Sequence, residues 1–301
     1  MAVSLLPLLA ACGSGAASHA ADGGGKSSAG SSGELDVPAD AGADLKKQYL
    51  MENAVAACMK KQGFVYTPVA PEDPLASWDT DGADYRLTEK YRQKYGFGIY
   101  AAFVYPDDPQ APGSKAAQNA STVSPNADYV ATLTASQKTA YDKALGGPPD
   151  PKTGEKGWSG CEGSANRQVY GYASPQERSN ASAAQDQANA QALNGDPQLI
   201  ALAQAYASCL SKDGIHVTTT QPTGIGDMVK FQASMSTPPN ARIGTVTPDG
   251  TPLDTMSKDE ALPLLTKDIA LALQDLKCGK EFRAAYFPKF LKAPTSGGGA
   301  G

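Results

Sequence analysis

Apolar residues recur every three or four positions over much of the chain, which is the spacing of one face of an α-helix. The clearest case begins at Asp196, a favourable N-cap, and Pro197, which suits the first helical position. One face of the segment that follows carries Leu199, Leu202, Tyr206, Cys209 and Leu210. We therefore predict a buried helix here, ended by Gly214.

The same criteria predict further helices. Residues 84–95 are charged and precede Gly96, and Ser174-Pro-Gln-Glu177 caps an alanine-rich stretch that runs to Leu193. Two capping boxes, Thr134–Gln137 and Ser257–Glu260, begin other helices. The C-terminal section is predicted to be helical, with an apolar side formed by residues 269–276, Phe282, Tyr286, Phe287 and Phe290.

Short β-prone runs interrupt this pattern. Residues 64–66 and 215–217 each follow a glycine and soon meet a proline, and residues 245–253 contain the turn sequence Pro-Asp-Gly that is typical of a β-hairpin. Residues 101–126 are rich in Pro, Ser and Asp and are expected to form a long loop. The predicted fold class is α+β, helix-dominated, with short strand pairs.

Two segments of the chain resemble each other. Ala54–Thr67 and Ala205–Thr218 are identical at six of fourteen aligned positions, including the cysteine and the glycine of a Cys-x4-Gly motif. Each predicts a helix that ends in glycine and is followed by a short strand. We expect two pseudo-repeat units, 44–173 and 174–292, and a disordered tail at 293–301. A motif repeated within one chain is typical of scaffold.

The chain has five cysteines, Cys12, Cys58, Cys161, Cys209 and Cys278. Without Cys12 the number is even, which favours disulfides in an exported protein. Four cysteines allow three pairings, and the repeat favours Cys58–Cys161 and Cys209–Cys278. No Cys-x-x-Cys is present and the chain has only two histidines, so neither a metal site nor a cofactor is expected.

The N-terminal segment is apolar from Ala2 to Ala11 and then reaches Cys12. Leu9-Ala10-Ala11-Cys12 resembles the lipobox of bacterial lipoproteins, in which the cysteine receives a lipid and becomes the first mature residue. Residues 1–11 are expected to be a signal segment, truncated because no basic residue precedes the apolar run. Residues 12–43 are rich in Gly, Ser and Asp, and we expect a flexible tether.

The lipobox, the tether and the two Cys-x4-Gly motifs together resemble uncharacterised extracellular lipoproteins of high-GC Gram-positive bacteria (actinobacterial type). "KYGFGI" at Lys94–Ile99 and "GCEGSA" at Gly160–Ala165 add to the resemblance. It implies a location on the outer face of the cytoplasmic membrane and disulfide chemistry, and it implies no activity.

The net charge and the few candidate catalytic or metal-binding residues narrow the range of possible functions. The formal net charge is −5, which gives no support to nucleic-acid binding. His19 and His216 stand alone, so no catalytic residue is assigned. "DTDGAD" at Asp79–Asp84 superficially suggests a calcium loop, but Lys90 stands where an EF-hand needs Glu, and a solvated acidic loop is expected.

An aromatic cluster lies between Tyr85 and Tyr105. It has two interpretations: the core of the first unit, or the floor of a binding groove formed by Tyr91, Tyr95, Phe97 and Tyr100.

The sequence thus predicts a lipoprotein anchored to the membrane through Cys12. We expect it to be a non-catalytic binding or accessory module whose partner is an envelope protein or a cell-wall ligand. The alternative is an extracytoplasmic enzyme that acts on the cell wall through paired carboxylates.

Overall fold

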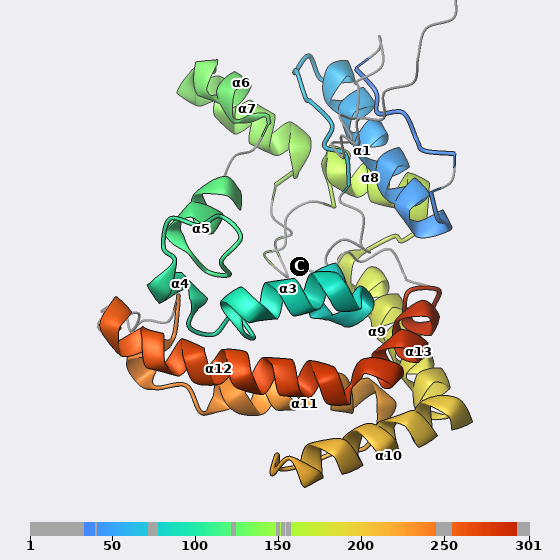
Figure 1. Cartoon of the computed structure of the whole chain (residues 1–301). Helices are drawn as coiled ribbons and strands as arrows, with labels where there is room; N and C mark the ends of the chain where they lie inside the picture. Colours follow the sequence, from blue (N-terminus) through green and yellow to red (C-terminus); the bar gives the residue numbers. More distant parts are fainter. Residues whose placement is uncertain are drawn as a thin grey trace, which may run out of the picture.

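The structure is a computed structural model that describes residues 33–39, 41–71, 78–121, 125–148, 151, 154, 158–244 and 255–293. The longer helices are α1 (Ala43–Lys61), α3 (Tyr85–Tyr95), α7 (Ala135–Leu145), α8 (Cys161–Tyr170), α9 (Pro175–Asn194), α10 (Pro197–Lys212), α11 (Pro222–Met235), α12 (Lys258–Cys278) and α13 (Lys280–Phe290) (Figure 1). The shorter ones are η1 (Asp79–Ala83), α4 (Ala101–Val104), α5 (Lys115–Ser121), α6 (Ala127–Thr132) and η2 (Pro239–Ala241). None of these helices combines the length and the apolar composition that crossing a bilayer requires.

The α+β prediction is wrong, because the described residues contain helices and no β-strand. Residues 64–66 and 215–217 do not pair with a strand in the described part of the chain. Side chains from other segments instead hydrogen-bond to the backbone at or next to these residues. The Asn126 amide bonds both the N–H and the C=O of Thr67, and Gln232 donates to the C=O of His216. These bonds satisfy backbone groups that a neighbouring strand would otherwise pair. The hairpin predicted at 245–253 lies outside the described residues.

Residues 101–126 also differ from the expected long loop, since they contain the short helices α4 and α5. The predicted helix starts are confirmed. Both capping boxes are present, at the starts of α7 and α12, and Asp196 caps α10 through its side chain.

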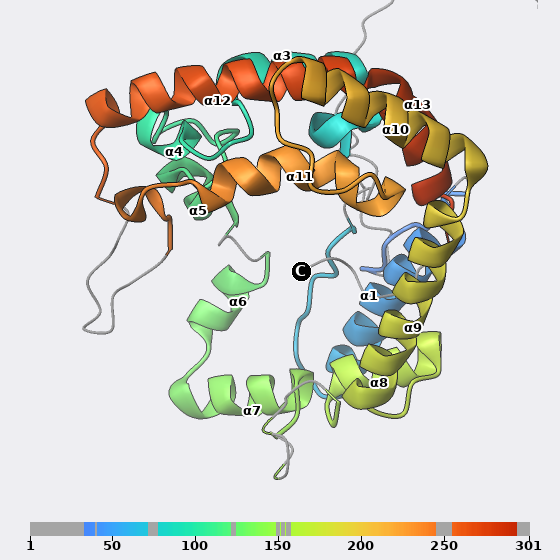
Figure 2. The ribbon, with the colours of Figure 1, turned by 90° about the horizontal axis from the view of Figure 1, so that it is seen from below.

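The helices pack in two groups. The N-terminal group consists of α1, α6, α7 and α8, whose apolar side chains form one cluster around Val55, Met59 and Tyr141. The C-terminal group contains α3, α4 and α9–α13, with its main core between α10, α11, α12 and α13. Helix α9 runs from the end of α8 to α10 and so connects the groups along the chain (Figures 1 and 2).

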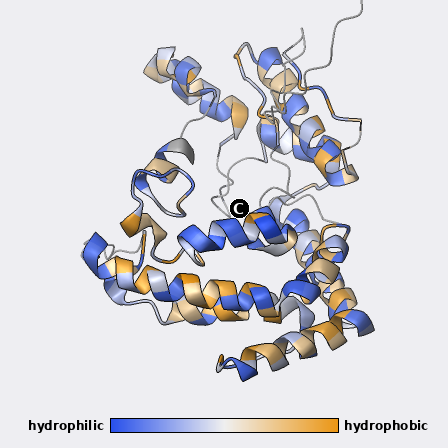
Figure 3. Ribbon diagram, viewed as in Figure 1, coloured by the Kyte–Doolittle hydropathy of each residue, from blue (hydrophilic) through white to orange (hydrophobic). Residues whose placement is uncertain are grey.

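This packing does not follow the expected boundary at residue 173. Helices α3 and α4 belong to the predicted first unit, but they pack against α12 of the second. Figure 3 shows that α3 is largely hydrophilic, and it nevertheless contributes the buried side chains of Thr88, Arg92 and Tyr95. A hydrophilic helix can pack in this core because its buried Arg92 forms an ion pair with Asp275 of α12.

The repeated motif adopts the same local structure in both places. After α1, the N–H of Phe64 donates to the C=O of Met59 and that of Gly63 to Lys60, with Gly63 at φ 82°. After α10, Ile215 donates to Leu210 and Gly214 to Ser211, with Gly214 at φ 79°. Both helices therefore end in a Schellman motif, whose left-handed position glycine occupies at little cost.

Candidate functional site

The aromatic residues proposed for a groove lie in the core. Tyr95, Phe97 and Tyr100 are 2%, 8% and 8% exposed, and they belong to three different hydrophobic clusters. Tyr91 is half-buried and packs against Tyr95, with ring centroids 4.9 Å apart. Of the two interpretations, this placement matches the core, and these four side chains do not share a groove.

A cavity of about 320 Å³ lies elsewhere, between α9, α11 and α13. One side is an aromatic ladder on α13, in which Phe282, Tyr286 and Phe290 are spaced four residues apart and therefore share a helix face. Their rings stack in sequence, with centroids 5.2 Å and 5.5 Å apart. Trp78 also lines the cavity and meets Phe290 edge-on, with ring centroids 5.1 Å apart. The other lining side chains are Asp186, Asn189, Ala190 and Leu193 of α9, Pro222, Thr223, Gly226 and Asp227 of α11, and Arg283 and Phe287 of α13.

Two carboxylates line this cavity, Asp186 from α9 and Asp227 from α11. Both side chains are exposed, and neither makes a hydrogen bond or an ion pair within the described part of the chain. Partial desolvation and the nearby charge of Asp81 raise the pKa of Asp227 above its usual value. Burial and Asp227 together raise the pKa of Tyr286 to about 12. The negative charge of this wall is thus incompletely compensated by the protein.

Behind the cavity lies a buried polar network centred on Asp275 of α12. Its Oδ2 accepts hydrogen bonds from Arg92 Nη1 and Arg283 Nη2, both at 2.7 Å, and its Oδ1 accepts one from the Tyr206 hydroxyl. Burial and Asp275 raise the pKa of Tyr206. Burial disfavours the charge of Arg283, but Asp275, Tyr206 and Asp81 together outweigh this effect and raise the pKa of Arg283. The network joins α3, α10, α12 and α13.

Arg283 lines the cavity, yet its donors are directed to protein groups. Besides Asp275, Nη2 donates to the Tyr206 hydroxyl and to the C=O of Gly226, and Nη1 donates to the C=O of Asp81. Its Nε has no hydrogen-bond partner among the described residues. It is buried beside Gly279, and a Cβ at that position would lie 3.0 Å from it. The Nη groups of Arg283 are thus bonded to protein groups, and its Nε lies beside Gly279, which is not part of the cavity lining.

Segment Asp79–Asp84, expected as a solvated acidic loop, packs against this region. It forms η1, and Gly82 at φ 127° approaches α13 so closely that a Cβ would lie 2.8 Å from Arg283 Cδ. Asp81 pairs with Lys230 at 3.3 Å, and Asp84 caps α3 by accepting from the N–H of Leu87. Asp81 and Asp84 are thus engaged in an ion pair and a helix cap.

The described lining of the cavity contains no Ser, Cys or His side chain. Its one hydroxyl besides Tyr286, that of Thr223, donates to Asn194 Oδ1 at 3.0 Å. His216 lies on the segment after α10 and is not part of the lining. A Ser–His or Cys–His pair therefore has no residues in the described lining of this cavity.

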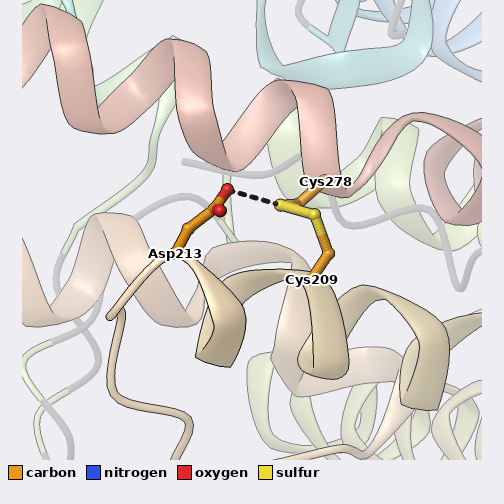
Figure 4. Close-up of side chains that lie close together, drawn as sticks. All are labelled: Cys209, Asp213 and Cys278. Carbon is orange, nitrogen blue, oxygen red and sulfur yellow. Dashed lines mark hydrogen bonds between the residues drawn. A yellow bond between two sulfur atoms is a disulfide. The ribbon is translucent and has the colours of Figure 1, made fainter.

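The structure contains two disulfides, Cys58–Cys161 and Cys209–Cys278, which is the pairing favoured by the repeat. In Figure 4 the second bridge lies beside Asp213, whose Oδ2 is 3.6 Å from Cys278 Sγ. These three residues have the proximity of a metal site. Cysteine binds a metal as the thiolate, however, and these two cysteines are bridged, so neither offers one. Cys12 and the tether up to residue 32 lie outside the described residues.

Two other hollows have fewer aromatic side chains: one borders the Cys58–Cys161 bridge, and the other borders α1 near Gly33. The cavity between α9, α11 and α13 is therefore the best candidate site. One sign of it is present in the sequence, the apolar side of the C-terminal helix, but no sequence pattern places α9 or Trp78 opposite that side. No family model, curated protein or solved structure matches the chain.

Proposed function

We propose that the protein is a non-catalytic binding module on the outer face of the cytoplasmic membrane, anchored by a lipid on Cys12. The observation that carries the proposal is the combination of two disulfides with the Leu9–Cys12 lipobox. Disulfides persist in oxidising compartments outside the cytoplasm. An acyl anchor would hold the chain there through the tether.

Metabolic labelling tests the anchor. The native gene, with its own upstream region, is expressed in a Gram-positive host grown with an alkyne-tagged palmitate analogue. We expect the wild type to carry the label and to sediment with membranes. Cys12→Ser should lose both properties, and Ser14→Ala, a neighbouring control, should keep them. An unlabelled wild type, or label retained by Cys12→Ser, would contradict the proposal.

The alternative function, a carboxylate-dependent cell-wall enzyme, has one observation in its favour: Asp186 and Asp227 line the same cavity. We expect the purified full-length chain carrying Cys12→Ser to release no soluble fragments from dye-labelled peptidoglycan. Release that disappears in Asp186→Asn and Asp227→Asn would establish the enzyme instead.

A further inference from the structure

The cavity between α9, α11 and α13 combines aromatic rings with acidic side chains. The rings of Trp78, Tyr286 and Phe290 line it, and Asp186 and Asp227 supply negative charge. Ring faces attract cations electrostatically, most strongly where the cation is shielded from water. At about 320 Å³ the cavity is at the lower end of the range of small-molecule sites.

The charges of the lining favour a cation over an anion or a neutral sugar. Arg283 is the single basic residue of the described lining, and it is held by Asp275, Tyr206 and backbone carbonyls. Asp81 repels Asp227, and Lys230 and Arg283 offset this repulsion only in part, since the pKa of Asp227 stays raised. A bound cation would relieve the repulsion, whereas a sugar would not.

The chemistry of the walls also favours an alkylated ammonium group over a primary one. A primary ammonium has three N–H donors to satisfy. The cavity surface is mainly carbon, with the rings on one side and Ala190, Leu193 and Pro222 on the other. Methyl groups on nitrogen remove the donors, spread the charge and pack against rings.

We propose that this cavity binds a small organic cation with a quaternary ammonium head, which lies against Tyr286, Phe290 and Trp78 and is attracted by Asp186 and Asp227. The inference rests on the proposed role as a binding module and names the ligand class. It does not depend on the lipid anchor, so the labelling experiment and the binding experiment fail independently.

Trp78 provides a direct readout. The chain has two tryptophans, and Trp158→Phe leaves the cavity tryptophan as the single one. The full-length chain with Cys12→Ser and Trp158→Phe is titrated with choline while tryptophan fluorescence is followed, and calorimetry on the Cys12→Ser chain gives an independent affinity. The neutral isostere 3,3-dimethylbutan-1-ol has the shape of choline without its charge.

We expect saturable choline binding, with the isostere about 10-fold weaker or worse. Asp227→Asn and Asp186→Asn should each weaken binding by about 3- to 10-fold. Tyr286→Leu should weaken it similarly, and Tyr286→Phe should keep it because the ring remains. Asp142→Asn and Tyr129→Leu lie in the N-terminal group and serve as matched controls that should bind choline normally. Thermal melts confirm that each variant is folded.

Equal binding of choline and its isostere would overturn the proposal in favour of a merely apolar cavity. Binding of N-acetylglucosamine without binding of choline would overturn it in favour of a sugar site. Phosphocholine should bind more weakly than free choline, because the two carboxylates repel its phosphate. Tighter binding of phosphocholine, or no saturable binding of choline, would also refute the inference.

Discussion

At the scale of single residues, the buried charges decide how the C-terminal group is assembled. Asp275 is fully buried and accepts from Arg92, which is 183 positions away, and from Arg283. Arg92 also donates to the C=O of Ala272 and lies over the ring of Phe97. A hydrophilic α3 can therefore pack on α12 because its buried cation is paired and hydrogen-bonded.

Asp275→Asn tests this network. The substitution keeps the shape of the side chain but leaves two buried arginines without their counter-charge, and we expect a loss of about 3–5 kcal/mol in the free energy of unfolding. Urea denaturation followed by circular dichroism measures it. Asp259→Asn, at an exposed position of the same helix, should cost less than about 1 kcal/mol. Equal losses in the two variants would show that the network does not stabilise the fold.

A second buried carboxylate predicts a pH dependence. Burial raises the pKa of Asp268 from 3.8 to about 6, although the N–H groups of Phe97 and Ile99 and the Arg92 charge oppose the shift. The folded state therefore binds this proton more tightly than the unfolded state does. The resulting stability is fully present below about pH 4 and is lost as the pH rises through about 6.

Asp268→Asn removes this titration. The variant should gain about 1–3 kcal/mol of stability relative to the wild type between pH 4 and pH 7. Denaturation curves across that range measure the difference, and Asp259→Asn should stay parallel to the wild type. Parallel curves for Asp268→Asn would refute the predicted shift.

At the scale of elements, the two Schellman motifs account for the residues that the two Cys-x4-Gly segments share. In each, a glycine with positive φ ends a helix that carries a cysteine one turn earlier. The chain then leaves with an apolar residue, Phe64 or Ile215, that packs back on the core. Residues 64–66 and 215–217 are predicted to be strands when β-propensity alone is considered. That prediction leaves out the side chains that hydrogen-bond to the backbone around them.

Gly63→Ala and Gly214→Ala should cost the same. No atom lies within 4 Å of the position of a Cβ at either glycine, so the cost is that of the left-handed backbone alone, about 1–2 kcal/mol. Thermal or urea unfolding measures it. Gly42→Ala keeps an allowed backbone, at φ −62° in open space, but replaces a favoured N-cap residue, so it should cost less, about 0.5 kcal/mol. A neutral effect at Gly63 and Gly214 would mean that these turns tolerate L residues.

At the scale of the whole molecule, each disulfide lies inside one helix group. Cys58–Cys161 joins α1 to α8, and Cys209–Cys278 joins α10 to the end of α12. The principal helix packing lies within the groups, and the Arg178–Asn166 hydrogen bond at 3.4 Å is one of the links between them. The groups should therefore lose structure separately.

Removing one bridge tests this separation. Each bridge closes a long loop and is worth up to about 4–5 kcal/mol in the chain-entropy model. In Cys58→Ala/Cys161→Ala we expect faster hydrogen exchange in α1, α7 and α8, with α10–α13 still protected. Cys209→Ala/Cys278→Ala should show the reverse, and Cys12→Ser should leave exchange unchanged. Exchange that rises equally in all helices of either double variant would mean that the molecule unfolds as one unit.

The sequence by itself determined what depends on neighbouring residues. The caps of α7, α9, α10 and α12 and the glycines that end α1, α3 and α10 are local signals, because each bond joins residues a few positions apart. The pairing of the cysteines followed from the same repeated motif.

Only the tertiary structure decided which surfaces meet. The aromatic ladder on α13 is visible in the sequence as an apolar stripe. Its position across the cavity from Asp186, Asp227 and Trp78 depends on contacts between residues far apart in the chain. The pairing of Arg92 with Asp275 is of the same kind. No local pattern encodes such contacts, since their geometry arises only when whole helices pack against one another.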